Sequence, residues 1–460
     1  MLNKTLQEIV AFPVEFVWGA ATSAYQIEGA CAEEGRTPSV WDTFCLRKGA
    51  IQNNDSADVA CDHYHRFRED VQLMRKLTLP AYRFSVAWPR IILDDSGRVN
   101  EAGLNFYDAL VDELLAADVQ PWITLFHWDL PQYVEDQGGW LNPRCVQWFA
   151  AYTQVVVQRL SDRVRHWITL NEPQCFLHFG HGLCTHAPGN ELSLSEQLTA
   201  AHHVLLAHGR ATSIIRETAK STPRIGWATV GHTMSPASTD DLDIEAARVA
   251  TMSVNKSNLW NNTWYSDPVF LGHYPEEGLK AYGAAAPQWD SRDMEIISTP
   301  LDFLGLNIYT ATPVRATGNC EWREAEIPLG AARTTLDWTV REECLYWGPR
   351  FHAERYSVPI VITENGMSNT DWVNLDGRVR DPQRIDYLHR HLLALHRCIL
   401  DGIDIQGYFQ WSLMDNFEWA EGFRRRFGLI HVDFESGKRT LKDSAYWYQQ
   451  VIQTNGQSLS

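Results

Sequence analysis

The sequence lacks a hydrophobic run long enough to cross a membrane. No apolar stretch approaches the roughly 20 residues that a spanning helix needs, and residues 1–14 contain no apolar core of the length found in a secretion signal. The nine cysteines are scattered without a CxxC pair, which is typical of free thiols in a reducing compartment. We therefore expect a cytoplasmic protein without a membrane partner.

Positive charge is also scarce, because 40 Lys and Arg residues face 57 Asp and Glu residues and the net charge is -17. Nucleic acids and anionic membranes attract basic surfaces, so neither is expected as a partner. The sequence contains no phosphate-binding glycine loop and no dinucleotide fingerprint, and we expect no cofactor. His178, His181, Cys184 and His186 lie close together, but their spacing is not a standard zinc ligand set, so we expect no metal site.

What the sequence does have is a regular alternation of short β-rich runs and helical patterns. Such alternation is typical of βα repetition around a parallel sheet, and eight repeats is the number in a TIM barrel. The predicted strands are 16–21, 81–88, 120–126, 167–170, 224–230, 303–309, 358–363 and 405–411.

Two long stretches interrupt this alternation. Residues 235–299 carry helical segments and are interpreted as an insertion in one βα unit, and 312–340 is interpreted as a long loop because it has few periodic signals. The sequence is 45% hydrophobic, which allows a large core, and it has no linker, repeat or low-complexity tract. We predict an α/β fold, with residues 1–460 forming a single (β/α)8 TIM barrel domain with long βα-loop insertions.

Two predicted strands run into a glutamate. The strand at 167–170 leads to Glu172, and the strand at 358–363 leads to Glu364. In a closed barrel of parallel strands chemistry lies at the carboxyl ends, so these side chains can face each other across the barrel mouth. A facing pair of carboxyl groups is the machinery of glycoside hydrolysis. Polar or aromatic residues also end other strands, and although each alone fits a structural role, their recurrence favours a functional site: Arg83, His127, Trp128, Asn307, Tyr309 and Trp411.

Seven sequence blocks resemble glycoside hydrolase family 1, the β-glucosidase family, in the family's order along nearly the whole chain. The blocks are 16–29, 82–89, 127–132, 169–173, 186–189, 362–366 and 410–433. The resemblance implies a retaining, exo-acting β-glycosidase on a (β/α)8 barrel that works through a covalent glycosyl-enzyme intermediate and needs no cofactor.

The resemblance also implies the roles of the catalytic residues. Glu364 is expected to be the nucleophile and Glu172 the acid/base, with Arg83 and Tyr309 beside Glu364 to favour its charged form. The retaining geometry requires the two carboxyl groups to lie ~5–5.5 Å apart. At that range two negative charges resist coexisting, so one pKa rises, and we expect Glu172 to hold the proton.

By the same resemblance, a pocket for the non-reducing sugar is expected. Amide, imidazole and carboxylate groups bind hydroxyl groups, and aromatic rings pack on sugar rings. The expected substrate-binding residues are Gln26, His127, Asn171, Asn307, Tyr309, Trp411, Glu418, Trp419 and Phe427. Gln174, where many relatives have Trp, and Trp338 are expected on the aglycone side.

The expected substrates are small β-glycosides, namely cellobiose-like disaccharides and aryl β-glucosides, with activity on β-galactosides or β-fucosides as well. One alternative is a 6-phospho-β-glycosidase, since the basic run 424–426 could meet a phosphate, although the carboxylate of Glu418 would repel one. Further alternatives are a non-catalytic sugar-binding barrel, which would not need both glutamates, and a metal-assisted barrel enzyme. The sequence leaves the oligomeric state open, a homo-oligomer included.

Overall fold

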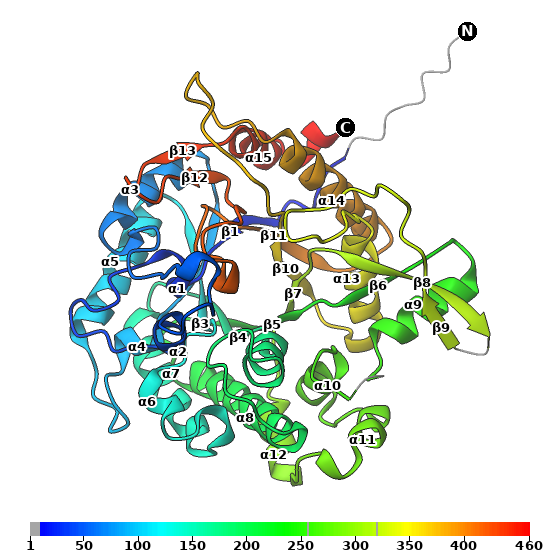
Figure 1. Cartoon of the computed structure of the whole chain (residues 1–460), viewed down its shortest axis with the longest axis horizontal. Helices are drawn as coiled ribbons and strands as arrows, with labels where there is room; N and C mark the ends of the chain where they lie inside the picture. The colour runs from blue at the N-terminus through cyan, green and yellow to red at the C-terminus, as the bar shows by residue number, and fades with distance from the viewer. Residues whose placement is uncertain (1–9, 255–256, 319–320) are drawn as a thin grey trace.

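The structure is a computed structural model that describes residues 10–254, 257–318 and 321–460. The expectation that residues 1–14 hold no secretion signal falls mostly on residues 1–9, which lie outside the described residues. Within them, eight strands close into a barrel in which all neighbours are parallel, so the predicted (β/α)8 fold is confirmed. Figure 1 shows these strands at the centre of the molecule with helices around them. The barrel strands are β1 (Val17–Ala21), β2 (Ala81–Ser85), β3 (Gln120–Phe126), β4 (His166–Asn171), β5 (Arg224–Val230), β7 (Phe303–Asn307), β10 (Ile360–Asn365) and β11 (Ile405–Trp411).

Most of the longer helices follow one barrel strand each and cover the outside of the barrel. They are α3 (His63–Lys76), α5 (Glu101–Ala116), α7 (Arg144–Leu160), α8 (Leu194–Thr218), α13 (Cys344–Tyr356), α14 (Pro382–Leu400) and α15 (Asp443–Gln453). Short helices lie in the connections: α1 (Ala24–Ile27), α2 (Val40–Cys45), α4 (Trp88–Ile91), α6 (Gln132–Glu135), the 3-10 turns η1 (Gln52–Asn54), η2 (Gly139–Leu141), η5 (Trp419–Glu421) and η6 (Gln457–Leu459), and the π-helix η3 (Cys175–Gly182).

Local sequence explains where these helices begin and which face they bury. Helix α8 starts at a capping box, in which Ser193 Oγ accepts from the Glu196 backbone N–H while the Glu196 carboxylate accepts from the Ser193 backbone N–H. Along α14, apolar residues recur at helical spacing, and Leu388, Leu392 and Leu395 are all fully buried. Both features are visible in the sequence, so local sequence indicates where α8 begins and which face of α14 is buried.

Large aromatic side chains fill the barrel interior below the strand ends. The ring of Trp122 lies 5.5 Å from that of Phe303 and 5.0 Å from that of Phe409. Gly226 makes room for Phe303, because a Cβ at Gly226 would lie 2.2 Å from that ring. The interior is therefore a packed core rather than a pore, and only the carboxyl ends of the strands are left for a site.

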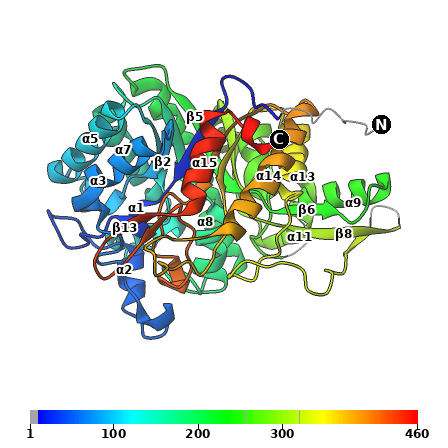
Figure 2. The same cartoon turned by 90° about the horizontal axis from the view of Figure 1, so that it is seen from above.

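The insertion after β5 is helical, as predicted, with one short strand at its start. It contains β6 (Thr233–Pro236), α9 (Asp241–Thr251), α10 (Thr263–Leu271), α11 (Glu276–Tyr282), η4 (Gly283–Ala285) and α12 (Ser291–Ile297). The interpretation of 312–340 as a loop is wrong in its first part, because β8 (Ala311–Gly318) and β9 (Glu321–Glu324) form a small sheet with β6. Much of this hairpin is exposed, so it carries no apolar run that marks a strand. Figures 1 and 2 show α9 and β8 projecting from the side of the barrel opposite α3 and α5.

After β11 the chain returns to contact the first barrel strand. A two-stranded ribbon of β12 (Ile430–Val432) and β13 (Arg439–Leu441) precedes α15. The Tyr448 hydroxyl on α15 then donates to the Gly19 carbonyl of β1 at 2.9 Å. Among the described helices, none combines the length and the apolar character needed to span a bilayer.

Candidate active site

A cavity of about 400 Å³ opens at the carboxyl ends of the barrel strands. Its walls include His127, Glu172, Asn307, Glu364 and Trp411, which end or closely follow β3, β4, β7, β10 and β11. This size is within the range of small-molecule sites, and the position is where closed parallel barrels carry out chemistry. The structure thus brings residues from five separate strands to one candidate site.

The two predicted glutamates share this cavity. Glu172 is 7% exposed and Glu364 is 3% exposed, and both line the wall. Asn171 Nδ2 donates to Glu172 Oε2 at 3.1 Å, and Arg83 Nη2 donates to Asn171 Oδ1 at 2.6 Å. Arg83 Nη1 also donates to Glu364 Oε1 at 2.5 Å. Asn171 and Arg83 therefore link the two carboxyl groups in one hydrogen-bonded chain.

Glu364 is surrounded by donors. Besides the contact from Arg83 to Oε1, the Tyr309 hydroxyl donates to Oε2 at 2.7 Å. Arg83 is fully buried, and its Nε and Nη1 also donate to Thr124 Oγ1 and the Thr363 carbonyl, both at 3.1 Å. A buried carboxylate with a donor on each oxygen, one of them a cation, is favoured in its charged form.

The two carboxyl groups differ in their electrostatic surroundings. Burial and, second, the charge of Glu364 raise the pKa of Glu172 to about 8. Burial also raises the pKa of Glu364 above its ordinary value, but the guanidinium of Arg83 and the hydrogen bond from Tyr309 oppose this rise. At neutral pH the arrangement therefore favours a protonated Glu172 beside an ionised Glu364.

The carboxyl group of Glu418 also lines the cavity. Its Oε2 accepts from Gln26 Nε2 and from Asn416 Nδ2, both at 3.3 Å. Gln26 is fixed in turn, because it donates to the Phe417 carbonyl at 2.8 Å and accepts from Ser23 Oγ at 2.6 Å. Burial raises the pKa of Glu418 to about 8. Gln26 itself is fully buried behind Glu418 and is not part of the cavity wall.

His127 lies among aromatic rings on the same side. Its ring stacks 5.8 Å from Trp411 and 6.1 Å from Trp419, and Trp419 stacks 4.5 Å from Trp128. Burial, and second the charge of Arg83, hold the pKa of His127 well below its ordinary value, so the imidazole is neutral. Asn171 Nδ2 lies 3.2 Å from His127 Nε2. This wall offers apolar ring surface with a neutral polar group in it.

Asn307, Tyr309, Trp338 and Phe427 also line the cavity. Asn307 Nδ2 donates to Asn171 Oδ1 at 3.0 Å. The ring of Tyr309 lies 5.3 Å from Trp338 and 6.1 Å from Phe427. Trp338 is thus in the cavity wall, beside the tyrosine that contacts Glu364.

Gln174 does not line the cavity, although the sequence places it two residues after Glu172. It is 1% exposed and donates to Thr229 Oγ1 at 2.6 Å and to the Asn261 carbonyl at 3.2 Å. The side chain therefore holds the segment before α10 rather than facing the cavity. A direct contact between Gln174 and an aglycone finds no support in this geometry.

Several wall residues were not predicted from the sequence. Cys175, Phe179 and His186 come from the segment that follows Glu172, and His232 and Trp260 come from the insertion after β5. His186 lies in block 186–189, which resembles the family. That block could have indicated His186 as a wall residue. The residues of the insertion carry no such signal, because nothing local shows which part of a long connection returns to the barrel mouth.

The backbone at the cavity is unusual in a way that no sequence pattern shows. Among the described non-glycine residues of the wall, Trp128, Glu172 and Trp419 adopt left-handed φ values of 76°, 48° and 49°. Such values cost bulky residues about 1–3 kcal/mol each and persist only where the surroundings fix them. Strained residues of this kind cluster at functional sites.

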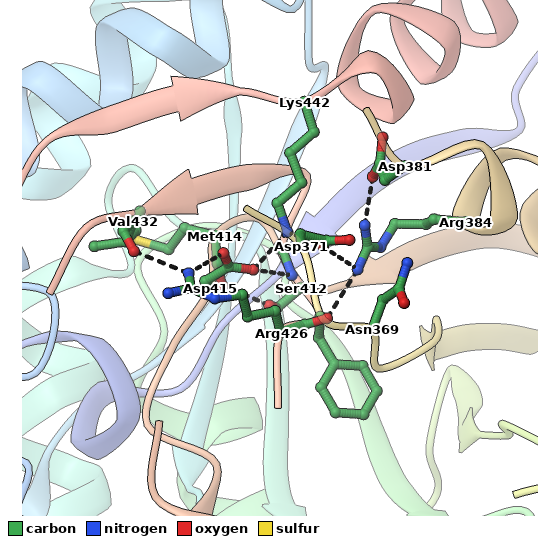
Figure 3. A network of polar contacts seen from close by, with 12 residues as sticks. Asn369, Asp371, Asp381, Arg384, Ser412, Met414, Asp415, Arg426, Val432 and Lys442 are labelled. Carbon is green, nitrogen blue, oxygen red and sulfur yellow. Dashed lines mark hydrogen bonds and ion pairs between the residues drawn. The ribbon is translucent and has the colours of Figure 1, made fainter. Parts of the chain in front are cut away.

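A buried network of charges holds the loops after β10 and β11 together (Figure 3). Lys442 Nζ donates to Asp371 Oδ2 and to Asp415 Oδ1, both at 2.6 Å. Arg426 Nη1 donates to Asp415 Oδ2 at 2.6 Å, and Arg384 Nη2 contacts Asp371 Oδ2 at 2.7 Å. The loop after β11 carries Glu418, Trp419 and Phe427, so this network fixes the part of the chain that forms one side of the cavity.

Within the described residues, the cluster of His178, His181, Cys184 and His186 does not converge in a metal-binding geometry. The described group that does, Cys31 with Asp42 and Asp58, contributes no residue to the cavity wall. Asp42 is already paired with Arg36 at 2.9 Å.

Three comparisons bear on this site. The family model of glycosyl hydrolase family 1 matches residues 9–457. Beta-glucosidase A of Thermotoga maritima is 41% identical over 446 residues, which cover 97% of this chain and 98% of that protein. A bifunctional beta-D-glucosidase/beta-D-fucosidase of Bifidobacterium breve is 40% identical over 466 residues, covering 96% of this chain and 98% of that protein.

A solved structure also matches this chain over nearly its whole length. The beta-glucosidase from Thermotoga maritima in complex with glucoimidazole superimposes with a TM-score of 0.90 at 40% sequence identity. The match covers 97% of this chain and 100% of that chain.

Proposed function

Because the chain belongs to glycosyl hydrolase family 1, it is a glycoside hydrolase that acts with retention, and we propose that it removes terminal β-D-glucosyl residues from the non-reducing ends of small β-glycosides. Cellobiose-like disaccharides and aryl β-glucosides are the proposed substrates, with β-fucosides and β-galactosides accepted as well. The relative that acts as both a glucosidase and a fucosidase supports this breadth.

In the proposed first step, Glu364 attacks the anomeric carbon. Its carboxylate is held charged by Arg83 and Tyr309, which leaves it ready to form the new carbon–oxygen bond. As that bond forms, the bond to the leaving oxygen breaks, and Glu172 gives its proton to that oxygen. The raised pKa of Glu172 supports this role, since the group is protonated at neutral pH before it is needed.

In the proposed second step, water breaks the covalent intermediate. Glu172 is now ionised and takes a proton from the water as its oxygen attacks the anomeric carbon, so that Glu364 is released as a carboxylate. Each turnover thus returns both groups to their starting states. Two displacements at one carbon give the retained configuration that the family has.

We propose that Glu418, Gln26, His127, Asn171 and Trp411 fix the sugar in the cavity. Gln26 would act at the edge of the site, because in the structure it lies behind Glu418. Asn307, Tyr309, Trp419 and Phe427 complete the proposed sugar site. Trp338 is proposed on the aglycone side, and Gln174 is proposed to act there only through the segment that it holds.

The observation that carries the proposal is that one cavity holds a glutamate with donors on both oxygens and a second glutamate whose pKa is raised to about 8. The test is Glu364→Ala assayed on an aryl β-glucoside. We expect kcat to fall by ~10⁴-fold or more, and added azide to restore turnover with an α-glucosyl azide as product. Substantial activity without azide would contradict the assignment of the nucleophile.

The same substrate separates the rival classes when it is assayed in excess chelator. Chelator-resistant turnover is expected. The absence of turnover by the wild-type protein would favour a sugar-binding barrel, and turnover lost with chelator would favour metal-assisted chemistry.

The 6-phospho-β-glycosidase alternative is weakened by the pairing of the basic run. Arg425 Nε donates to Glu421 Oε2 at 2.7 Å, and Arg426 is engaged by Asp415. Two of the three arginines therefore already have carboxylate partners. Paired glucosides with and without a 6-phosphate test this point, and we expect faster hydrolysis of the unphosphorylated member. The reverse order would overturn the proposed role of Glu418.

A further inference from the structure

The phenol of Tyr309 that contacts Glu364 is carried by a short stretch of loop backbone. Tyr309 lies two residues after the end of β7, and its hydroxyl donates to Glu364 Oε2 at 2.7 Å. A side chain on a loop keeps a precise position only when neighbouring groups fix the loop backbone. The contacts that hold this backbone therefore help to orient the proposed nucleophile.

Regular strand pairing is interrupted where β10 ends. Against β7 the register of β10 shifts between Ile362 and Glu364, and against β11 it shifts between Ile362 and Asn365. Irregularities of this kind re-aim side chains next to active sites. The Ile308 backbone N–H donates to the Glu364 carbonyl at 2.9 Å, and Asn365 Nδ2 donates to the Ile308 carbonyl at 2.7 Å. The link between the ends of β7 and β10 thus depends partly on a side-chain amide.

Tyr387 on α14 adds to this link from outside the barrel. Its hydroxyl donates to the Tyr309 carbonyl at 2.7 Å and accepts from Asn365 Nδ2 at 3.1 Å. Tyr387 is 1% exposed and is not part of the wall of the catalytic cavity. Because a hydroxyl can donate and accept at once, this one group joins the residue that carries the phenol to the residue that follows Glu364.

The Tyr387 hydroxyl is itself held in place. The Tyr387 ring stacks on that of His391, one turn further along α14, with ring centroids 3.7 Å apart. The Tyr408 hydroxyl donates to Asn365 Oδ1 at 2.8 Å, which orients the Asn365 amide so that its Nδ2 meets the Tyr387 hydroxyl. All four side chains are buried. Packing and hydrogen bonds therefore fix the hydroxyl before any substrate binds.

We infer that Tyr387 is a positioning residue for the proposed nucleophile, because its hydroxyl holds the Tyr309 backbone where the phenol can hydrogen-bond to Glu364. This inference rests on the proposed function, since it needs Glu364 to attack the anomeric carbon. Without the Tyr387 hydroxyl, the Tyr309 carbonyl loses this donor and the loop can shift, so the phenol no longer stays aligned with Glu364. The chemical step slows, whereas sugar binding changes little because Tyr387 lies outside the cavity wall.

The test is Tyr387→Phe, which removes the hydroxyl and keeps a ring to stack on His391. On an aryl β-glucoside we expect kcat to fall by about 10- to 100-fold, because a small misplacement of reacting groups is enough for such a loss. The inhibition constant of glucose is expected to change by about twofold or less, since the loss is in the transition state.

The pH profile is a readout that a merely structural role would not move. Burial raises the pKa of Glu364, while Arg83 and the hydrogen bond from Tyr309 oppose the rise. A weaker bond from Tyr309 raises this pKa, so in Tyr387→Phe we expect the acidic limb of kcat/KM to move to higher pH by roughly half a unit. The variant removes none of the other ionisable groups that interact with Glu364, which are Arg83, Glu172, Cys175 and Glu418.

A double variant shows whether Tyr387 acts through Tyr309. Tyr309→Phe alone removes the hydrogen bond from the phenol to Glu364. Adding Tyr387→Phe to that variant is expected to lower kcat further by about twofold or less, because the interaction that Tyr387 supports is already gone. Losses that multiply in the double variant would overturn the inference, since they would mean that the two residues act independently.

Tyr448→Phe is the matched control, because Tyr448 is also a buried tyrosine on an outer helix whose hydroxyl donates to a barrel carbonyl, that of Gly19. It is expected to lower the urea midpoint about as much as Tyr387→Phe does, but to leave kcat and the acidic limb unchanged. The same kinetic losses in both variants would overturn the inference.

A second variant guards against a folding defect in Tyr387→Phe. Asn365→Ala removes the amide that donates to the Tyr387 hydroxyl and to the Ile308 carbonyl, and the same shift of the acidic limb is expected. An unchanged limb in Asn365→Ala would overturn the inference even where Tyr387→Phe does not fold.

The outcomes separate this inference from the proposed function. If Glu364→Ala keeps its activity without azide, the proposed function itself fails. If Glu364→Ala is inactive and azide restores turnover, but Tyr387→Phe keeps the wild-type kcat and acidic limb, only the inference is overturned.

Discussion

Glu172 and Glu364 are the same residue type, and their surroundings make them different chemical groups. Glu364 accepts hydrogen bonds from a guanidinium and a phenol, whereas Glu172 Oε2 accepts from the neutral amide of Asn171. Burial without a cation in direct contact raises the pKa of Glu172 to about 8. The division into nucleophile and acid is thus proposed from neighbours rather than from residue type.

The first prediction concerns leaving groups. Glu172→Gln keeps the shape of the side chain but removes the transferable proton. We expect kcat/KM on cellobiose to fall by about 10²- to 10⁴-fold, and kcat/KM on a glucoside of an acidic nitrophenol to fall much less, because that leaving group needs no proton. An equal loss on both substrates would contradict the role of Glu172 as an acid.

The second prediction concerns pH. The active form needs Glu172 protonated, so kcat/KM on cellobiose is expected to fall as pH rises through about 8. The fall at low pH is expected from protonation of Glu364. Glu418 also has its pKa raised to about 8, so Glu418→Gln is the control. This variant is expected to keep the basic limb at lower overall activity, whereas a lost limb would assign it to Glu418 instead.

At the scale of elements, buried charge pairs connect the loops after β10 and β11. Lys442 connects Asp371 in one loop to Asp415 in the other, and all three side chains are almost completely buried (Figure 3). Asp415 also accepts from the Gly428 backbone N–H at 3.0 Å, next to Phe427. The pairs therefore fix the loop after β11, which bears Glu418 and Phe427, relative to the loop after β10.

The third prediction follows from this network. Lys442→Met leaves two buried carboxylates without their shared cation, and we expect the free energy of unfolding to fall by ~3–5 kcal/mol. Arg380→Met is the matched control, because Arg380 and Asp376 form an exposed pair and its loss is expected to cost about 1 kcal/mol or less. Urea unfolding followed by tryptophan fluorescence measures both. Equal effects in the two variants would show that the buried network has no special role.

At the scale of the whole molecule, the two ends of the described chain meet and close the barrel. β1 pairs with β11 as well as with β2, and Arg439 on β13 donates to Asp70 on α3 at 2.8 Å through Nε. Burial alone would raise the pKa of Asp70, but hydrogen bonds from His63 and Arg439 outweigh burial and lower it. This contact links an early helix to the end of the chain through a charged carboxylate.

The fourth prediction concerns acid stability. Because the pKa of Asp70 is lower in the folded than in the unfolded chain, its contribution is present above the unfolded value of ~3.9 and is lost as pH falls through the folded value. Asp70→Asn is therefore expected to lower the urea midpoint at neutral pH. The difference from wild type is expected to shrink below about pH 4. Asp95→Asn, at an exposed carboxylate, is the control and is expected to shift the midpoint little at any pH.

The sequence predicts a feature more accurately when the residues that indicate it are neighbours in the chain. Barrel strands are buried on both faces and are read as continuous apolar runs, so each of the eight was predicted within a few residues. The strands β8 and β9 are exposed in large part, lack such a run and were missed. Glu172 and Glu364 were found at strand ends, but Gln174 was expected at the aglycone and instead lies beneath Asn261. The treatment of residues 1–460 as one domain stays a prediction.

The sequence by itself determined the alternation of strands and helices, the barrel and the position of two glutamates at strand ends, because these depend on periodicity and on residues next to each other in the chain. Only the tertiary structure decided that Arg83 also donates to Asn171, that Trp260 returns from a long insertion to the barrel mouth, and that Lys442 holds two distant loops. Such contacts join residues far apart in sequence. They form only when the burial of the whole core brings those residues together, so no local pattern encodes them.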